Sequence, residues 1–296
     1  MDVERIKPHS PTGGPEDWDF AERSVRAYCS CLNDFGIKPT LFVVPDTAEA
    51  QRDVLLECAE TYRAEIGFHI HPQCLGGRWR DPDAHEYLGG YSRAEQAALI
   101  AEGVDQWVSA LGFQPRSFRG GNFSANDETF GLLVSLGFTH GSVSQPGRQV
   151  TRFRATWADA VWDIHRPHEA FRCAPGDLDF VEVPLTSDRT QTDHWTGVGD
   201  VRLEGASPDE ILKASRQEIA RQVENPEALN HACILTHNFV NFWSCDESQG
   251  GRRGVLEETI RGLQELGDTN GLTTVGATTQ DVRAAYLKRE KDHRGK

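Results

Sequence analysis

Short apolar segments alternate with longer amphipathic segments over almost the whole chain. The apolar segments are of the kind that forms buried strands, and apolar residues recur at helical spacing between them. Strands are expected at 40–44, 64–71, 116–121, 139–143, 160–164, 180–185, 231–237 and 272–275, and helices at 20–35, 48–62, 92–111, 126–136, 207–224, 255–266 and 280–288. Strands that alternate with helices usually pair in parallel through helical crossovers. The alternation therefore predicts an α/β fold, either a β/α barrel or a doubly wound sheet.

The length of 296 residues suits one large domain with a sizeable core. The chain has no internal repeat and no interdomain linker, so a single domain over residues 1–296 is the simplest interpretation. Residues 1–17 are rich in proline, glycine and charge, and are predicted to be irregular apart from a strand remnant at the start. The basic tail 288–296 is expected to fray.

The charge balance restricts the partners of the protein. Lys and Arg number 31 against 45 Asp and Glu, so the net charge of −14 disfavours binding to nucleic acid. No segment approaches the roughly 20 apolar residues that a membrane span needs. The polar first residues do not resemble a secretory signal, and seven cysteines without a Cys-x-x-Cys pattern suggest reduced thiols. These features predict a cytoplasmic protein and leave its oligomeric state open; the expectation of a small-molecule or glycan substrate comes from the resemblance described below.

The expected strand 64–71 ends in two histidines, His69 and His71, and Pro72 then stops it. Side chains two residues apart in a strand point to the same face, so the two imidazoles are expected side by side. The carboxyl ends of parallel strands are where such folds keep their sites. The pair is therefore either half of a metal site or two surface histidines at a strand end.

Other expected strand ends also carry polar residues. Arg119 precedes a pair of glycines, His237 ends an apolar run, and Asp2 and Glu4 stand on alternate positions at the chain start. Asp163 lies at the end of a further expected strand. Together these residues supply carboxylates, a third histidine and an arginine, which are the groups that a hydrolytic metal site requires.

Four segments in order resemble the polysaccharide deacetylases, the carbohydrate esterases with a NodB-type domain, and especially their intracellular relatives. Phe35–Val44 is similar to the family's strand with the pattern G-hydrophobic-K-x-T-F-F-V, and Glu65–Pro72 to its E-I-G-x-H…H-P metal motif. Ser117–Ser124 resembles the F-R-x-P-x-G block, and Ile234–Asn238 the late L-x-x-H block. The resemblance covers about residues 30 to 285. It implies a distorted (β/α)7 barrel that uses one divalent metal ion, with zinc favoured over cobalt, nickel or manganese.

The resemblance also implies a ligand set for the metal, namely His69, His71 and Glu4. The family usually spaces its two histidines four residues apart, whereas here they are two apart. Either the turn between them is shortened, or only His69 is a ligand and another group replaces the second. Because the acidic motif lies at the very start of the chain, Asp46 or Asp163 is an alternative source of the carboxylate ligand.

The same resemblance implies the remaining roles at the site. Asp2 would be the general base, Arg119 would orient it, and His237 would be the general acid on the leaving amine. The residues implied to support the substrate or the arginine are Gly121 and Asn122 through their backbone amides, Leu235 in the acyl pocket, and Asp163 beside Arg119.

Three functions remain open on this basis. The leading hypothesis is a metal-dependent hydrolase that removes an acetyl or formyl group from the amide nitrogen of an amino sugar or small conjugate. The second is another β/α-barrel metal hydrolase of the amidohydrolase type, although there the His-x-His pair normally belongs to the first strand. The third is a catalytically degenerate barrel that binds a sugar. One bound ion, two ions or none would distinguish the three.

Overall fold

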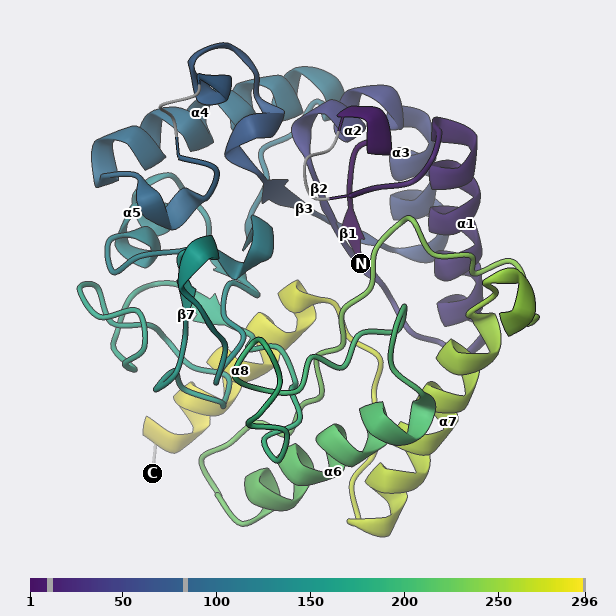
Figure 1. The fold of residues 1–296 in the computed structure, drawn as a ribbon. Coiled ribbons are helices and arrows are strands. Elements are labelled where there is room, and N and C mark those ends of the chain that lie inside the picture. Colours follow the sequence, from purple (N-terminus) through teal and green to yellow (C-terminus); the bar gives the residue numbers. More distant parts are fainter. Residues whose placement is uncertain (10–12, 82–84, 295–296) are drawn as a thin grey trace.

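The computed structural model describes residues 1–9, 13–81 and 85–294, and its centre is a parallel sheet of six strands in the order β1-β2-β3-β4-β5-β8. The strands are β1 Asp2–Val3, β2 Thr40–Val43, β3 Glu65–Ile70, β4 Ser117–Gly120, β5 His140–Gly141 and β8 Val181–Glu182. Figure 1 shows the strands near the middle of the molecule with the helices around them. The predicted single α/β domain with parallel strands and helical crossovers is confirmed.

Eight α-helices connect or cover the strands in the described part of the chain. They are α1 Trp18–Asp34, α2 Pro45–Ala50, α3 Arg52–Tyr62, α4 Arg93–Leu111, α5 Thr129–Ser135, α6 Pro208–Val223, α7 Arg253–Thr269 and α8 Thr279–Arg294. Two capping boxes begin α4 and α6, in which Ser92 and Ser207 each exchange hydrogen bonds with the glutamate three residues later. A small antiparallel hairpin, β6 Gln149–Val150 and β7 Ala155–Thr156, stands apart from the main sheet. Single 3-10 turns are η1 Lys7–His9, η2 Pro72–Cys74, η3 Gly77–Arg80, η4 Leu88–Gly90, η5 Gly121–Phe123, η6 Thr151–Phe153 and η7 Glu247–Gln249.

The segment 232–238 closes the barrel between β8 and β1. The Thr186 amide donates to the Cys233 carbonyl at 2.9 Å, and the Asp2 amide donates to the Thr236 carbonyl at 2.8 Å. The Asn238 amide then donates to the Asp2 carbonyl at 3.1 Å. This segment occupies the seventh position around the barrel. It is joined to β1 by one isolated bridge, between Asp2 and His237, and is not the regular strand predicted for 231–237.

Two predicted strands, at 160–164 and 272–275, are wrong. The segment 232–238 occupies the place between β8 and β1, and among the described residues neither predicted segment joins the main sheet as a strand. Residues 160–164 approach the sheet only through the next residue, His165, which bridges Glu182 in the antiparallel sense. In the second segment Val275 is 79% exposed, so its apolar residues do not form the buried face of a strand.

The two faces of β3 decide where its histidines point. Phe68 and Ile70 pack outward under α4, where a Cβ at Gly103 would lie 2.9 Å from an atom of each. Phe68 also lies 6.0 Å from the ring of Phe118 on β4. Because side chains alternate along a strand, this outward packing turns His69 into the barrel.

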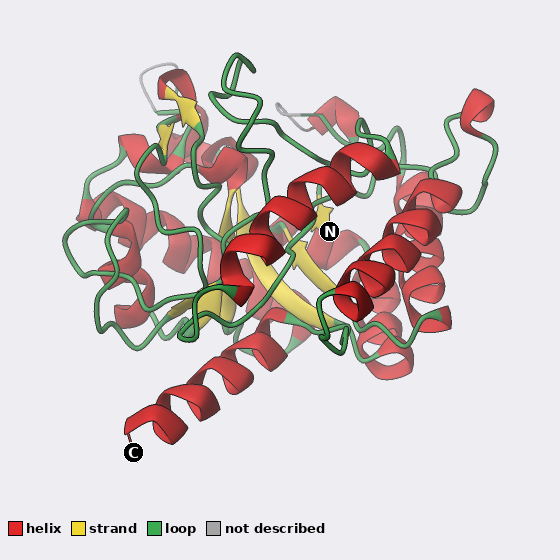
Figure 2. Cartoon of the chain, turned by 90° about the horizontal axis from the view of Figure 1, so that it is seen from below, coloured by secondary structure: helices red, strands yellow, loops and turns green. Residues whose placement is uncertain are grey.

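The start of the chain agrees with the expectation of a strand remnant, which is β1, whereas the end of the chain differs. Residues 1–17 also contain the turn η1, and residues 10–12 lie outside the described part. The predicted fraying of 288–296 is wrong for 288–294, because α8 is helical to Arg294 and Glu290 pairs with Arg166 at 3.1 Å; 295–296 lie outside the described residues. Figure 2 shows α8 extending past the other elements. No helix among the described residues is both long and apolar enough to cross a membrane.

Candidate metal centre and active site

Side chains from four places in the sequence meet at the carboxyl ends of the strands. Asp2 and Glu4 belong to β1 and the residues just after it, His69 and His71 to the end of β3, and His237 to the segment paired with β1. The parallel register sets Arg119 of β4 directly beside His69. Residues two apart in a strand point to the same side, so Asp2 and Glu4 share one direction and His69 and His71 share another. All of these groups face one region of the barrel.

Glu4, His69 and His71 form a cluster of three potential metal ligands. The Nε2 atoms of both imidazoles lie 3.1 Å from Glu4 Oε1, and one ligand atom from each residue lies within 4.8 Å of the others. The three side chains are almost fully buried. This separation matches that of ligands around one ion with bonds of about 2 Å.

The hydrogen bonding of His69 is compatible with a cation between these groups. Its Nδ1 lies 2.9 Å from the Arg119 carbonyl oxygen, which can only accept, so Nδ1 carries a proton. The Nε2 atom faces a carboxylate oxygen of Glu4, so it carries either a second proton, which the raised pKa of His69 favours, or a metal ion. The other carboxylate oxygen, Glu4 Oε2, is buried and has no hydrogen-bond partner among the described residues. A divalent ion bound by the three groups would satisfy both Nε2 and this carboxylate oxygen.

Asn238 holds the acidic motif in place although β1 is only two residues long. Its side-chain oxygen accepts the Glu4 amide at 2.9 Å, and its side-chain nitrogen donates to the Glu4 carbonyl at 2.8 Å. The strand β1 is therefore held on both sides, by its pairing with β2 on one side and by the bonds to Asn238 on the other. The alternative carboxylate ligand Asp46 is instead paired with Arg5.

Asp2 lies between the metal cluster, an arginine and the third histidine. Its Oδ2 is 3.9 Å from His69 Nε2 and 4.0 Å from His237 Nε2, and its Oδ1 is 3.4 Å from Arg119 Nε. Burial alone would raise the pKa of Asp2, but the charges of Arg119 and the two histidines outweigh it and lower the pKa below the ordinary value. Asp2 is therefore an ionised carboxylate at neutral pH.

His237 has an acidic partner, Glu204, that the sequence patterns did not identify. The distance from His237 Nδ1 to Glu204 Oε1 is 2.6 Å, and the ring of Phe239 stacks on the imidazole at 4.8 Å. The side chains of His237 and Glu204 are 12% and 20% exposed, more than those of the metal cluster. No motif marks Glu204, because it lies in an irregular loop 33 residues from its partner.

The glycine turn after β4 lies against the metal cluster. A Cβ at Gly121 would be 2.3 Å from His71 Nδ1, so only glycine leaves room for this imidazole. The next two residues, Asn122 and Phe123, have positive φ angles of 56° and 58°. This turn therefore brings the backbone at Gly121 and Asn122 beside the ligands.

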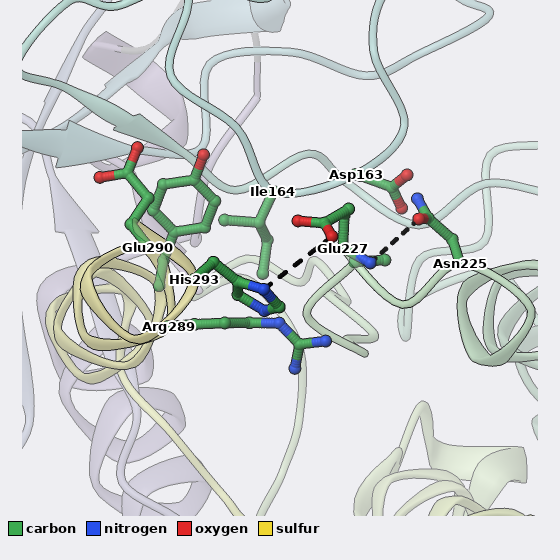
Figure 3. A pocket seen from close by; sticks show the side chains of 9 residues that line it. Asp163, Ile164, Asn225, Glu227, Arg289, Glu290 and His293 are labelled. Atoms are coloured by element: carbon green, nitrogen blue, oxygen red, sulfur yellow. Dashed lines mark hydrogen bonds and ion pairs between the residues drawn. The ribbon is translucent and has the colours of Figure 1, made fainter. Parts of the chain in front are cut away.

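Leu235 and Asp163 have different surroundings. Leu235 lies two residues before His237 and is buried within the hydrophobic core. Asp163 is not brought to the cluster, in contrast to the expectation that it supports Arg119. Its carboxylate accepts from both terminal nitrogens of Arg221, at 2.7 and 2.5 Å, and it lies in a pocket of about 370 Å³ with Asn225, Glu227 and His293 (Figure 3). The ion pair with α6 draws Asp163 to this pocket.

Comparisons with known proteins identify the fold. No protein-family model and no curated protein sequence matches the chain. A protein from Mycobacterium smegmatis assigned as a polysaccharide deacetylase has a TM-score of 0.57 at 18% identity, over 92% of this chain and 80% of that one. One from Pseudomonas aeruginosa PAO1, assigned likewise, has a TM-score of 0.56 at 14% identity, over 97% and 83%. The Puue allantoinase has a TM-score of 0.52 at 14% identity, over 89% and 77%. The chain thus has the NodB-type polysaccharide-deacetylase fold, as its motifs predicted.

Proposed function

We propose that this protein is a metal-dependent hydrolase that removes an acetyl or formyl group from the amide nitrogen of an amino sugar or small conjugate. One observation carries the proposal. Glu4, His69 and His71 surround a single point, and Asp2 and His237 lie next to it on the same side of the barrel. Ligands, a carboxylate and a histidine in this arrangement are what amide hydrolysis requires.

The proposed cofactor is one divalent ion, with zinc favoured by the two imidazoles and one carboxylate of the site. Bound there, it would lower the pKa of a water molecule toward about 7 and polarise the amide carbonyl. Glu4 would supply the negative charge to the ion, and the Arg119 carbonyl would keep the His69 ring oriented.

Asp2 and His237 divide the proton transfers between them in this proposal. Asp2 is ionised and its Oδ1 is held by Arg119, so Oδ2 is available to accept a proton from the attacking water. His237 directs Nδ1 at Glu204, which leaves Nε2 to donate a proton to the departing nitrogen. Glu204 orients the ring, as a carboxylate does for a histidine in a hydrolase.

The substrate would be held by the backbone after β4 and by one apolar side chain. The amides at Gly121 and Asn122 are proposed to share the developing negative charge on the carbonyl oxygen. Leu235, which is buried two residues before His237, would line the space for the acyl methyl group.

The two alternative functions have less support from the geometry. A two-ion amidohydrolase site needs further ligands, and among the described residues the single group of three or more potential ligands is the Glu4 cluster. A degenerate barrel was suggested by the position of the acidic motif at the chain start, yet Asp2 and Glu4 both lie beside His69.

The test is to measure metal content and deacylation together. We expect about one zinc or cobalt ion per chain and hydrolysis of N-acetyl or N-formyl amines that a chelator abolishes and added metal restores. The ion should be lost in His69→Ala and retained in the control His293→Ala, which removes a surface histidine 41% exposed on α8. Two ions per chain, or one ion with no deacylation of any amide tested, would contradict the proposal.

A further inference from the structure

Three arginines gather beside the candidate site, although the protein as a whole has a net charge of −14. The guanidinium carbons of Arg119 and Arg148 each lie 5.5 Å from the centre of the Phe123 ring. Arg148 and Arg202 in turn share Asp200, whose carboxylate is 3.6 Å from Arg148 Nη1 and 2.9 Å from Arg202 Nε. Three guanidinium groups therefore lie at one side of the site, with the carboxylate of Asp200 between two of them.

Arg202 presents unused hydrogen-bond donors. Its Nε donates to Asp200, whereas neither terminal nitrogen makes a hydrogen bond within the described residues. Its side chain is 26% exposed. An arginine held through Nε with a free and accessible pair of N–H groups is preorganised to bind a planar anion through two hydrogen bonds.

The loop that carries Arg202 is firmly attached to the site. Arg252 Nε donates to the Leu203 carbonyl at 2.7 Å, and the Leu203 amide donates to the Leu235 carbonyl at 3.2 Å. Glu204, the partner of His237, is two residues from Arg202, so their Cα atoms are at most about 7 Å apart. Asp2 and Glu204 both raise the pKa of Arg202 together with Asp200, which offsets the effect of burial and keeps it charged.

Arg148 is a buried arginine that contacts Asp200, the same carboxylate that holds Arg202. Its side chain is only 1% exposed, its Nε has no hydrogen-bond partner among the described residues, and its one ion pair is the 3.6 Å contact with Asp200. Asp200 therefore faces two guanidinium groups and neutralises only one charge. Because Glu204 and Asp2 also act on Arg202, it is the free N–H groups of Arg202, and not a net positive charge, that favour an anionic ligand.

We propose that Arg202 binds a carboxylate of the substrate, so that the protein acts on N-acyl compounds that also carry an acid group. This inference rests on the proposed function and narrows its substrate class. A carboxylate carries one charge and matches the two free N–H groups of Arg202. A phosphate dianion would bring a second negative charge close to Asp2 and Glu204 without a further cation to balance it.

The experiment uses three N-acetylated acids, N-acetylglycine, N-acetyl-β-alanine and 4-acetamidobutyrate, each paired with its neutral primary amide. We expect the metal-loaded protein to prefer at least one acid over its amide by about 10- to 100-fold in kcat/KM, the worth of a charge-assisted pair. Arg202→Gln should remove this preference mainly through KM, and Arg202→Lys should restore part of it. The control Arg152→Gln, which removes an exposed arginine 5.7 Å from the Trp195 ring, should leave the preference unchanged.

Other outcomes have definite meanings. No preference for any acid, or equal losses on acid and amide in Arg202→Gln, would overturn the inference and indicate that Arg202 acts through Glu204 and His237. If the protein hydrolyses none of the six compounds, the proposed function fails for this class of amide. Calorimetric binding of the three acids to the unmodified protein and to Arg202→Gln then decides the inference alone, and equal binding to both overturns it.

Discussion

Glu182 offers a quantitative test of the electrostatics within the barrel wall. This carboxyl group on β8 is fully buried, and it accepts hydrogen bonds from the Val143 amide at 2.9 Å, the Ser144 amide at 2.8 Å and the Ser144 hydroxyl at 2.7 Å. Burial raises the pKa of Glu182 from 4.5 to about 7, because these bonds and the charge of Arg119 offset only part of the lost hydration.

The effect of Glu182 on the free energy of unfolding follows from the difference between its pKa in the folded and in the unfolded chain. Below pH 4.5 the group is protonated in the folded and the unfolded chain and has no effect. Between pH 4.5 and 7 the folded chain keeps a proton that the unfolded chain has lost, so the free energy of unfolding falls as the pH rises. Above pH 7 the full cost remains, and at 1.36 kcal/mol for each pKa unit it is about 3 kcal/mol.

Glu182→Gln should remove this cost, because the amide keeps the accepting oxygen and does not ionise. We expect the variant to unfold with a free energy about 3 kcal/mol higher than the unmodified protein at pH 8, and nearly equal to it at pH 4.5. Urea denaturation followed by circular dichroism from pH 4.5 to 8.5 measures the free energy of unfolding of both proteins. The contributions of the other titrating groups cancel when the two values are subtracted. Glu60→Gln, on the exposed side of α3, is the control and should show no trend. A difference between Glu182→Gln and the parent that does not change with pH would refute the reasoning.

The remaining predictions concern the site. His69→Ala should abolish metal content and His71→Ala should weaken it strongly by elemental analysis; full metal in either variant would remove that imidazole from the ligands. Gly121→Ala should weaken metal affinity about 10- to 100-fold in chelator competition, because its Cβ would lie 2.3 Å from His71 Nδ1. His237→Ala should lower kcat on amides by about 10²–10⁴ with metal intact, and less on an activated aryl ester; equal losses would argue against the acid role. Glu204→Gln should lower kcat less than His237→Ala, because its amide oxygen still accepts from Nδ1, and an equal loss would contradict this.

The sequence by itself determined the features that depend on neighbouring residues. The direction shared by His69 and His71 follows from the two-residue period of a strand, which holds in any fold that contains it. The starts of α4 and α6 follow from Ser92 and Ser207, because a capping box lies within four residues. The alternation of strands and helices was sufficient to predict parallel pairing and helical crossovers.

Only the tertiary structure decided which distant residues complete the site. Glu204 reaches His237 across 33 residues, and Asn238 holds Glu4 across 234, because the segment 232–238 closes the barrel against β1. Residues 160–164 form no strand of the main sheet, and Asp163 pairs with Arg221 of α6 rather than with Arg119. Such partners are chosen by how the whole chain packs, since a side chain pairs with whichever group the fold brings within hydrogen-bond distance, and no local pattern records that choice.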